Sequence, residues 1–404
     1  MFSGAFCQLY STHMLSRDSF GIYGDDAWKE RERARKRREY TVQAVLMLLL
    51  IALLAAVVMN VSDNLEARHI HSGFGFLNNP AGFDIGEALI PFTSADHMGR
   101  AFMVGLFNTI KVSIVSIIAA TVLGCVVGLM RLSRHPMLRL LGTAHVEVYR
   151  NIPLLVLLLA VYLAVTELLP AGRMALHVGD WIYLSKAGLQ FACPTMGSLS
   201  LLVALGCGVV AGLLTAMVAK RRMTGLMSNL SGLAAFACVF VVSWMACGIV
   251  GGWEHPVQTR FALRGGGQLS PEFLALSLGL TLFTSAAIAE IVRAGVLAVK
   301  PEQWNAGLAL GMTMTETISY VVFPQSMRLV VPPLASQYMN LTKNSSLAVM
   351  VGYPDLVNIG NTVINVSAQA LEVICIIMGV YLVLNLVISV IMNGLNARIM
   401  RAPQ

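Results

Sequence analysis

The chain has 404 residues, of which 56% are hydrophobic and only 12% are charged, and its formal net charge is +7. Soluble globular domains carry about 25% charged residues, so a folded surface this poor in charge would aggregate in water. The same figures exclude a disordered chain, whose signature is low hydrophobicity. Seven cysteines without a C-x-x-C pair exclude a disulfide-stapled secreted protein. An all-α polytopic membrane protein remains.

The basic residues are concentrated near the amino terminus. Residues 29–38 (KERERARKRR) carry seven of the 28 basic residues and stand directly before an apolar run that begins near Val42. A basic segment beside an apolar run is typical of the cytoplasmic flank of a membrane helix. We therefore favour this interpretation over nucleic-acid binding, and expect residues 1–40 to form a disordered, basic cytoplasmic leader.

Apolar segments long enough to cross a membrane recur along the chain. A bilayer core about 30 Å thick requires roughly 20 apolar residues in a helix. About eight segments meet or nearly meet this requirement, and the seventh is the least apolar because several polar residues interrupt it. The predicted spans are 42–60, 104–130, 151–169, 198–219, 230–250, 273–297, 329–350 and 370–392.

The distribution of basic residues predicts the orientation of these spans. With the amino terminus inside, twenty of the 28 basic residues fall in predicted cytoplasmic segments and six fall in outer loops. Cytoplasmic loops carry such an excess of lysine and arginine. Eight spans with both termini in the cytoplasm satisfy this rule. The outer loops are expected to contain no folded domain, and they are 61–101, 170–197, 251–272 and 351–369.

Motifs for catalysis are missing from the sequence. No lysine follows a glycine, so the phosphate-binding G-x-x-x-x-G-K-[ST] loop cannot exist. Neither H-E-x-x-H nor G-x-S-x-G occurs. The sequence predicts no catalytic residue, no metal site, no cofactor and no ATPase site of the chain's own.

The segment after the sixth span, residues 289–333, combines a short helical pattern with several prolines. Pro301 suits the first turn of a helix, so residues 301–312 are predicted to form a short helix outside the membrane. Gly307 and Gly311 are expected to give this helix a small-residue face that lets another backbone or a partner surface approach closely. Further prolines, at 324, 332 and 333, are expected to break the chain again before the seventh span.

Glu290 and Arg293 stand at the start of the same segment, three residues apart. Residues with this spacing share one face of a helix. The sequence therefore predicts that the two side chains pair as the sixth span leaves the bilayer.

This segment resembles the EAA loop of the membrane subunits of bacterial binding-protein-dependent ABC importers. That loop has a Glu-Ala-Ala run, a glycine four residues after the second alanine, and a later proline. Here Asn305-Ala306-Gly307 stands where Glu-Ala-Ala is expected, so the acidic position is lost. The glycine, the proline and their spacing are kept. The resemblance implies an ATPase-coupling loop within 300–324 that includes Trp304, Asn305, Ala306, Gly307, Gly311 and Pro324.

Further stretches resemble the polar and general L-amino-acid branch of these permeases. They are GFGFLNNPAGFDIGEALIPF (73–92), FNTIKVSIVSIIAATVLGCVVGLMRLS (107–133), EVYRNIPLL (147–155) and NLTKNSSLAVMVGYPDL (340–356). The likeness covers nearly the whole chain after residue 40. It implies a type I importer permease of the bacterial inner membrane, with a homologous permease, ABC ATPase subunits and a periplasmic amino-acid-binding protein as partners.

The resemblance also implies a division of the chain. The permease core comprises residues 102–169 and 272–395. An anchor helix at 41–60 and a periplasmic loop at 61–101 precede the core. Residues 170–271 hold an inserted helix pair with its periplasmic loops.

Polar residues interrupt the seventh span on one side. A charge at the centre of a span costs about 2.5–3.5 kcal/mol, so Lys343 is expected to face protein or water. Its polar neighbours fall within about 120° of the helix circumference, which predicts one polar face. We expect this face to line the translocation path or a subunit interface. An alternative is an ion pair of Lys343 with an acid such as Glu167, Glu290 or Glu372, or with an acid on a partner.

A second polar group stands at the cytoplasmic mouth of the third span. Glu147, Arg150 and Asn151 precede Pro153. A loop ion pair is one interpretation, and the family resemblance favours a gate or interface. The residues predicted for the path or gate are Glu147, Arg150, Asn151, Gln337, Asn340, Lys343, Asn344 and Ser345.

The sequence therefore predicts a permease subunit of an ATP-driven amino-acid importer. An ion-gradient-driven secondary transporter is the main alternative, because broken helices with polar residues near the midplane are common there. A membrane scaffold without a transport role is a third possibility.

Overall fold

The computed structural model describes residues 23–67, 73–195, 197–219, 225–259 and 263–400. The chain divides into two compact units, Met1–Ser72 and Gly73–Gln404. The fold is mostly helical, as the sequence predicts, with short strands between residues 176 and 269.

The described part of the first unit is one helix, α1 (Tyr23–Ala67). Its apolar part is long enough to cross a membrane, which agrees with the predicted anchor. The expected disorder of the leader is wrong for residues 23–40, which are helical, while residues 1–22 lie outside the described part. Ion pairs one turn apart stabilise the basic segment, with Arg35 2.9 Å from Glu39 and Lys36 2.7 Å from Glu32.

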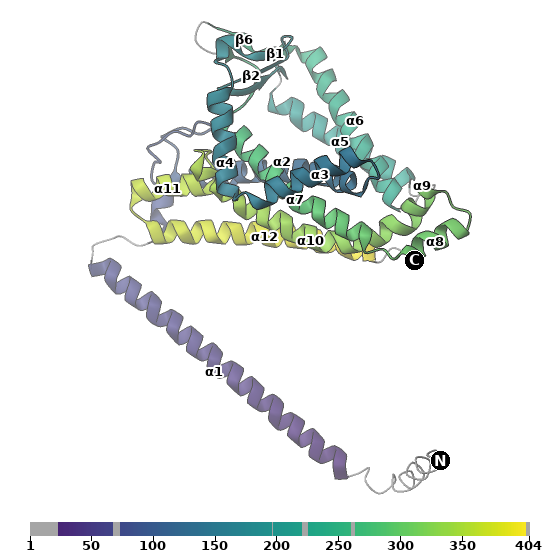
Figure 1. Ribbon diagram of the computed structural model, residues 1–404. Coiled ribbons are helices and arrows are strands. Elements are labelled where there is room, and N and C mark those ends of the chain that lie inside the picture. Colours follow the sequence, from purple (N-terminus) through teal and green to yellow (C-terminus); the bar gives the residue numbers. More distant parts are fainter. Residues whose placement is uncertain (1–22, 68–72, 196, 220–224, 260–262, 401–404) are drawn as a thin grey trace. The chain divides into compact units, whose positions relative to one another are not determined.

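The core of the second unit is built on two long helices, α2 (Met98–Leu132) and α7 (Pro271–Leu297), which pack along each other (Figure 1). Glycines permit this close approach, since a Cβ on Gly124 would lie 2.7 Å from Ile288 and one on Gly128 would lie 2.9 Å from the Ala289 carbonyl. Three further helices pack around them and bury Leu158, Leu280 and other apolar side chains. The five are α2 (Met98–Leu132), α4 (Leu154–Leu163), α7 (Pro271–Leu297), α10 (Phe323–Asn344) and α12 (Ala370–Met400).

The third predicted span begins with a sharp bend that the sequence analysis missed. Helix α3 (Pro136–Asn151) packs on α2 and α7, and then turns by 106° into α4, which a π-helical turn, Ala164–Leu168, extends. Pro153 stands at the bend and cannot donate a backbone hydrogen bond, so it favours a break there.

Helix α10 continues through the prolines that were expected to break the chain. Pro332 and Pro333 lie inside it, and Pro324 lies in its first turn after the π-helical turn Ile318–Val322. That expectation is therefore wrong. Burial of Val330, Val331 and Leu334 against the core stabilises the helix where the prolines remove hydrogen-bond donors.

The outer loops are more ordered than predicted. Residues 351–369 were expected to be a loop but contain α11 (Leu356–Ser367), whose Leu356 and Ile359 pack against Gly105 of α2. The 3-10 turns η1 (Phe74–Asn78) and η5 (Ser345–Met350) flank the same region. Phe76 and Ala81 are buried against Met98.

The loops on either side of the inserted helix pair form a small β-structure, contrary to expectation. Strands from both loops form one antiparallel sheet of order β1-β2-β3-β8, in which Leu189 of β3 pairs with Leu269 of β8. Local sequence patterns do not reveal such a long-range pairing. Two-stranded ribbons join β4 to β5 and β6 to β7. The strands are β1 (Leu176–Val178), β2 (Ile182–Ser185), β3 (Gly188–Phe191), β4 (Cys193–Pro194), β5 (Trp253–Glu254), β6 (Val257–Gln258), β7 (Leu263–Arg264) and β8 (Gly267–Leu269), with the 3-10 turn Gly172–Met174 before them.

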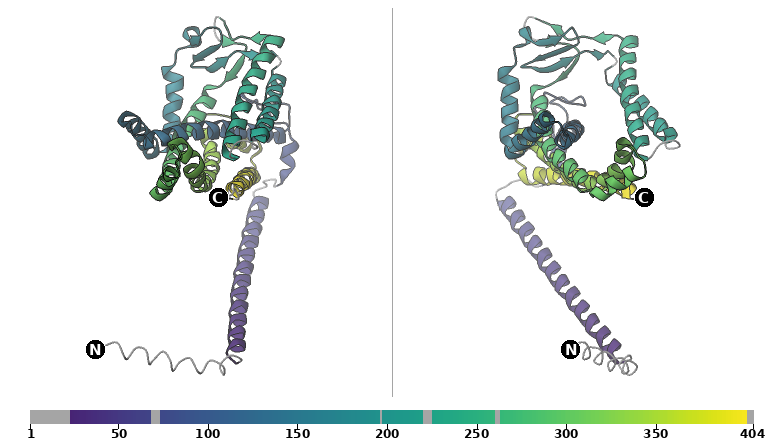
Figure 2. Two further views of the ribbon diagram at one scale, coloured as in Figure 1. Left: turned by 90° about the vertical axis from the view of Figure 1, so that its right-hand side faces the viewer. Right: turned by 45° about the vertical axis from the view of Figure 1, so that its right-hand side comes forward.

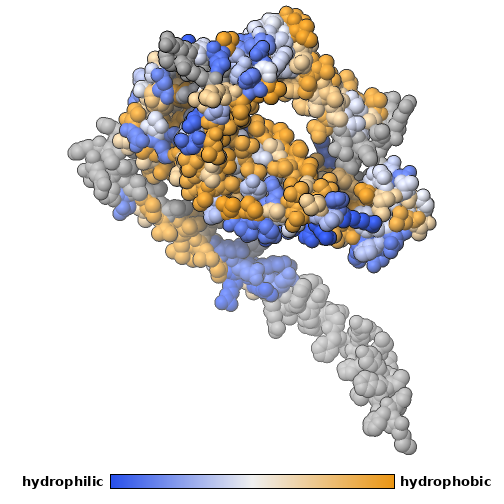
Figure 3. Space-filling model, turned by 45° about the horizontal axis from the view of Figure 1, so that its top comes forward, coloured by the Kyte–Doolittle hydropathy of each residue, from blue (hydrophilic) through white to orange (hydrophobic). Residues whose placement is uncertain are grey.

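The inserted helices α5 (Ser198–Ala219) and α6 (Gly225–Gly251) pack chiefly on each other and extend from the sheet beside the core, as two views show (Figure 2). Gly212 and Gly232 face each other across this pair. Hydrophobic side chains cover much of the visible surface of the second unit's helices (Figure 3).

Six described helices are long and apolar enough to cross a membrane, or seven if α3 with α4 counts as one bent span. The remaining predicted span, α10, does not meet this criterion because polar and proline residues interrupt it.

Candidate functional site

A short helix outside the predicted spans follows α7. Helix α8 (Pro301–Ala309) has Pro301 in its first turn, and Gly311, two residues past its end, has a φ of +79°. The amides of Gly311 and Met312 donate to the carbonyls of Leu308 and Gly307, at 3.0 and 3.2 Å. This is the Schellman arrangement, which requires a left-handed residue and therefore favours glycine.

The two glycines of this segment have different roles. A Cβ on Gly307 would lie 2.7 Å from the Thr317 side chain, so Gly307 permits packing within this chain. Gly311 is exposed and has nothing within 4 Å of its Cβ position. The close approach predicted at Gly307 is therefore made within this chain, by Thr317, whereas Gly311 serves the turn.

Helix α9 (Met314–Thr317) continues the segment after this turn. Thr313 caps it, with the Glu316 carboxylate accepting hydrogen bonds from the Thr313 amide and hydroxyl, both at 2.8 Å. These bonds hold the pKa of the Glu316 carboxyl below its usual range. The capping box satisfies backbone donors at the start of α9.

Large apolar side chains of α8, of α9 and of the turns that follow them are exposed. Leu310 is 80% exposed, and the others are between 41% and 54% exposed. Asn305 and Ala306 are also exposed, Trp304 is half-buried, and Pro324 lies at the start of α10. An exposed apolar group of this kind marks an interaction surface. We call it the α8–α9 surface, formed by Leu308, Leu310, Met314, Ile318 and Tyr320.

The polar residues of α10 lie on the side away from the core of this chain. Leu334, Leu341 and Thr342 are buried, whereas Asn340 and Lys343 are exposed. Gln337 and Asn344 are half-buried on the same side. Ser345 differs, since it is buried with its hydroxyl donating to the Thr342 carbonyl at 2.8 Å. The predicted polar face is thus present, but Ser345 is not part of it.

The acids weighed as partners of Lys343 make other contacts. Glu167 lies 3.7 Å from Lys186, and Glu372 accepts a hydrogen bond from the Gly73 amide at 2.9 Å. Glu290 pairs with two arginines. Within the described part of the chain, Lys343 has no carboxylate within ion-pair distance.

The residues at the mouth of the third span are brought together at the bend between α3 and α4. The Asn151 amide donates to the Glu147 carbonyl at 2.7 Å and to the Glu147 carboxylate at 3.2 Å. Arg150 lies 3.6 Å from Glu290. The structure therefore connects this predicted gate to α7.

Glu290 also pairs with Arg131, which the sequence analysis did not select. The Arg131 side chain is 9% exposed and reaches Glu290 from the end of α2, while Gly142 lets α3 approach Arg131 closely. The predicted Glu290–Arg293 pair is wrong, since the tertiary contacts bring two distant arginines nearer. We call Arg131, Glu290 and Arg150 the ion-pair cluster. It joins the ends of α2, α3 and α7.

A second cluster lies at the opposite end of α2 and was also missed. Lys111 is 2.5 Å from Glu87 and 4.4 Å above the Phe273 ring. The Ser270 hydroxyl donates to Glu87 at 2.5 Å, and the Asn108 amide donates to the Glu87 carbonyl at 2.8 Å. This cluster fastens the segment before α2 to the beginning of α7. One signal in the sequence pointed to this cluster, namely the charge of Lys111 within an apolar run.

Comparisons with known proteins show the family of this chain. Residues 204–401 match the family described as binding-protein-dependent transport system inner membrane component. The general L-amino acid transport system permease protein AapQ of Rhizobium johnstonii is 38% identical over 379 residues, which cover 90% of this chain and 92% of AapQ. The putative amino-acid ABC transporter permease protein YhdX of Escherichia coli is 39% identical over 370 residues, which cover 90% and 94% of the two chains.

One further relative and one solved structure were also matched. The glutamate/glutamine/aspartate/asparagine transport system permease protein BztB of Rhodobacter capsulatus is 35% identical over 398 residues, covering 90% of this chain and 93% of BztB. The crystal structure of an amino acid ABC transporter with histidines aligns with a TM-score of 0.45 at 21% identity, covering 74% of this chain and 94% of that one.

The helical core, its apolar spans and these matches define a permease of the ABC importer type I class. The chain belongs to the binding-protein-dependent family of inner-membrane transport components, in its amino-acid branch. It is a permease subunit of an ATP-driven amino-acid importer, and the ion-gradient-driven alternative is not favoured.

Proposed function

We propose that the α8–α9 surface is where ATPase subunits act on this permease, which has no ATPase site of its own. The observation that carries the proposal is the exposed apolar group on a short, rigidly capped segment outside the spans. Apolar side chains at a water-exposed end of a protein favour a protein partner. Asn305 is exposed at the position where the family resemblance expects glutamate, so the contact here is apolar rather than ionic.

Motion of α8 reaches the membrane through α7. Helix α8 begins four residues after α7 ends, and Glu290 lies two turns before that end. Because Glu290 pairs with Arg131 and Arg150, a displacement of α7 also acts on α2 and α3. The ion-pair cluster thus connects the ATPase-facing segment to the Glu147–Asn151 gate. This coupling involves two global states, as allosteric coupling requires.

The polar face of α10 lines the path together with a second permease, by this proposal. Asn340 and Lys343 point away from this chain's core, which supports an assembly that covers them. Leaving Lys343 against lipid would cost about 2.5–3.5 kcal/mol. A periplasmic binding protein delivers the amino acid on the side of the sheet, and both termini lie in the cytoplasm, as the basic residues indicate.

A crosslinking experiment tests this proposal in the complete importer. Cysteine replaces Leu308, which is 44% exposed, or Val178 of β1, which is 71% exposed on the opposite side and serves as the matched control. We expect the Leu308 variant to crosslink to the ATPase and the Val178 variant not to do so. Crosslinking of neither variant, or of both, would contradict the assignment.

Uptake into vesicles tests the energy source. The chain reconstituted with its second permease, ATPase and binding protein is expected to accumulate amino acid only when ATP is supplied. Uptake by the permease alone, driven by an ion gradient, would favour the secondary transporter instead.

A further inference from the structure

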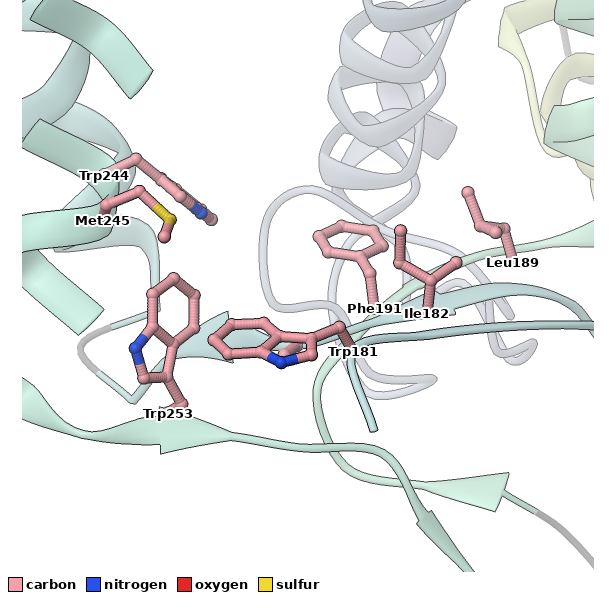
Figure 4. Close-up of a pocket in the computed structure, with 8 residues that line it drawn as sticks. Trp181, Ile182, Leu189, Phe191, Trp244, Met245 and Trp253 are labelled. Carbon is pink, nitrogen blue, oxygen red and sulfur yellow. The ribbon is translucent and has the colours of Figure 1, made fainter. Parts of the chain in front are cut away.

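A cavity of about 410 Å³ lies between the sheet and the inserted helix pair (Figure 4). Three of the chain's five tryptophans surround it. All of its lining side chains are apolar or aromatic, and none is charged. They are Trp181, Ile182, Leu189, Phe191, Ala192, Trp244, Met245 and Trp253.

The walls of the cavity come from two kinds of element. Trp244 and Met245 reach in from α6, while Ile182, Leu189 and Phe191 come from β2 and β3 (Figure 4). These walls are built closely. A Cβ on Gly248 would overlap the Trp253 ring, so the glycine lets this indole lie against α6. Trp253 in turn meets Trp181 edge to face, with ring centroids 4.9 Å apart.

Part of the cavity wall, Trp244 and Met245, belongs to a candidate membrane span. Met245 stands six residues before the end of α6 at Gly251, which corresponds to about 9 Å of helix. The best apolar window of α6 is only 6% buried and that of α5 is 17% buried. The space-filling view also shows an open gap between this pair and the other helices (Figure 3). Lipid therefore has access to the helices that form one wall.

We propose that this cavity binds an acyl chain of a phospholipid in the outer leaflet. Its depth excludes a water-soluble partner, and a polar ligand would lose its hydrogen bonds to water without finding charged or amide side chains in the lining. Tryptophan is enriched where acyl chains meet headgroups. The choice of leaflet rests on the orientation proposed above, whereas the acyl chain as occupant does not.

Fluorescence quenching tests the proposal with the full-length chain in phosphatidylcholine vesicles. Replacing Trp28 and Trp304 by phenylalanine leaves only the three tryptophans of the cavity. We expect phosphatidylcholine brominated along its chains to quench them strongly and aqueous iodide to quench them weakly. Strong quenching by iodide with weak quenching by the brominated lipid would overturn the proposal.

A matched pair of variants then distinguishes the cavity from general contact with lipid. Met245→Phe fills the cavity, whereas Val250→Phe adds the same side chain at an 83% exposed position of α6 outside the lining. We expect Met245→Phe to lose most of the quenching by lipid and Val250→Phe to keep it. Equal quenching in the two variants would overturn the proposal.

A labelling measurement on the unmodified cavity covers the case in which Met245→Phe does not fold. Phosphatidylcholine with a photoreactive group in its chain should label the peptide that contains Trp244 and Trp253. Labelling of exposed α12 without labelling of this peptide would refute an acyl chain in the cavity. None of these measurements depends on ATP-driven uptake. A negative result would therefore refute the lipid proposal without affecting the proposed transport function, and a failure of ATP-driven uptake would not affect the lipid proposal.

Discussion

Replacing Gly311 by valine should impair coupling by the ATPase. Gly311 has a φ of +79°, and nothing lies within 4 Å of its Cβ position, so the effect is purely one of backbone conformation. A left-handed conformation costs an ordinary L-residue about 1–2 kcal/mol, and a β-branched residue is especially unfavourable there. A cost of this size corresponds to a factor of about 5–30 in the local equilibrium between the intact and frayed end of α8.

The assay compares Gly311→Val with Gly311→Asn, because asparagine tolerates the left-handed region. Hydrogen exchange at the Gly311 and Met312 amides should speed up by a factor of about 5–30 in the valine variant and change little in the asparagine variant. ATP-driven uptake should fall in the same order. If both variants exchange and transport as the unmodified protein does, the conformational reasoning is refuted.

Further predictions concern the ion-pair cluster, the outer side and the core. Glu290→Ala leaves Arg131 largely buried without a counter-charge, so the free energy of unfolding should fall by about 3 kcal/mol. The loss should be smaller in a double variant that also has Arg131→Leu. Thermal unfolding in detergent measures both variants. Burial raises the pKa of Asp355 from 3.8 to about 7, so the folded chain binds this proton more tightly and Tm should fall as pH rises from about 4 to 7. Asp355→Asn keeps the cap of α11 and should flatten that slope; an unchanged slope would contradict the assignment. Gly124→Ala should lower the free energy of unfolding by about 1–3 kcal/mol, because the added Cβ meets Ile288 of α7. Gly206→Ala should leave it unchanged, because nothing lies within 4 Å of that Cβ position.

The candidate site was predictable where it depends on local spacing. Proline at the start of α8 and glycine at its end follow from backbone restrictions that act within a few residues. The polar face of α10 also follows from helical periodicity alone. What a side chain touches was not predictable in this way, as Gly307 shows by packing on Thr317.

The ion pairs show where local reasoning fails. Glu290 and Arg293 have the spacing for a pair on one helix, yet Glu290 contacts Arg131, 159 residues away. A charge near the end of a span is satisfied by whichever opposite charge the helix packing brings nearest. That choice depends on which helices approach each other at Gly124 and Gly142, and the sequence does not specify those partners.

By itself, the sequence determined that this protein is helical and crosses a membrane several times, because the bilayer requires long apolar runs whose backbone bonds close within each helix. It also indicated the ATPase-coupling segment, through residues whose spacing resembles a known loop. Only the tertiary structure decided the bend at Pro153, the sheet that joins two separate loops, and the partners of the buried charges. The physical reason is that a helix forms from contacts within one turn, whereas sheets and ion pairs form between residues that the fold must first bring together.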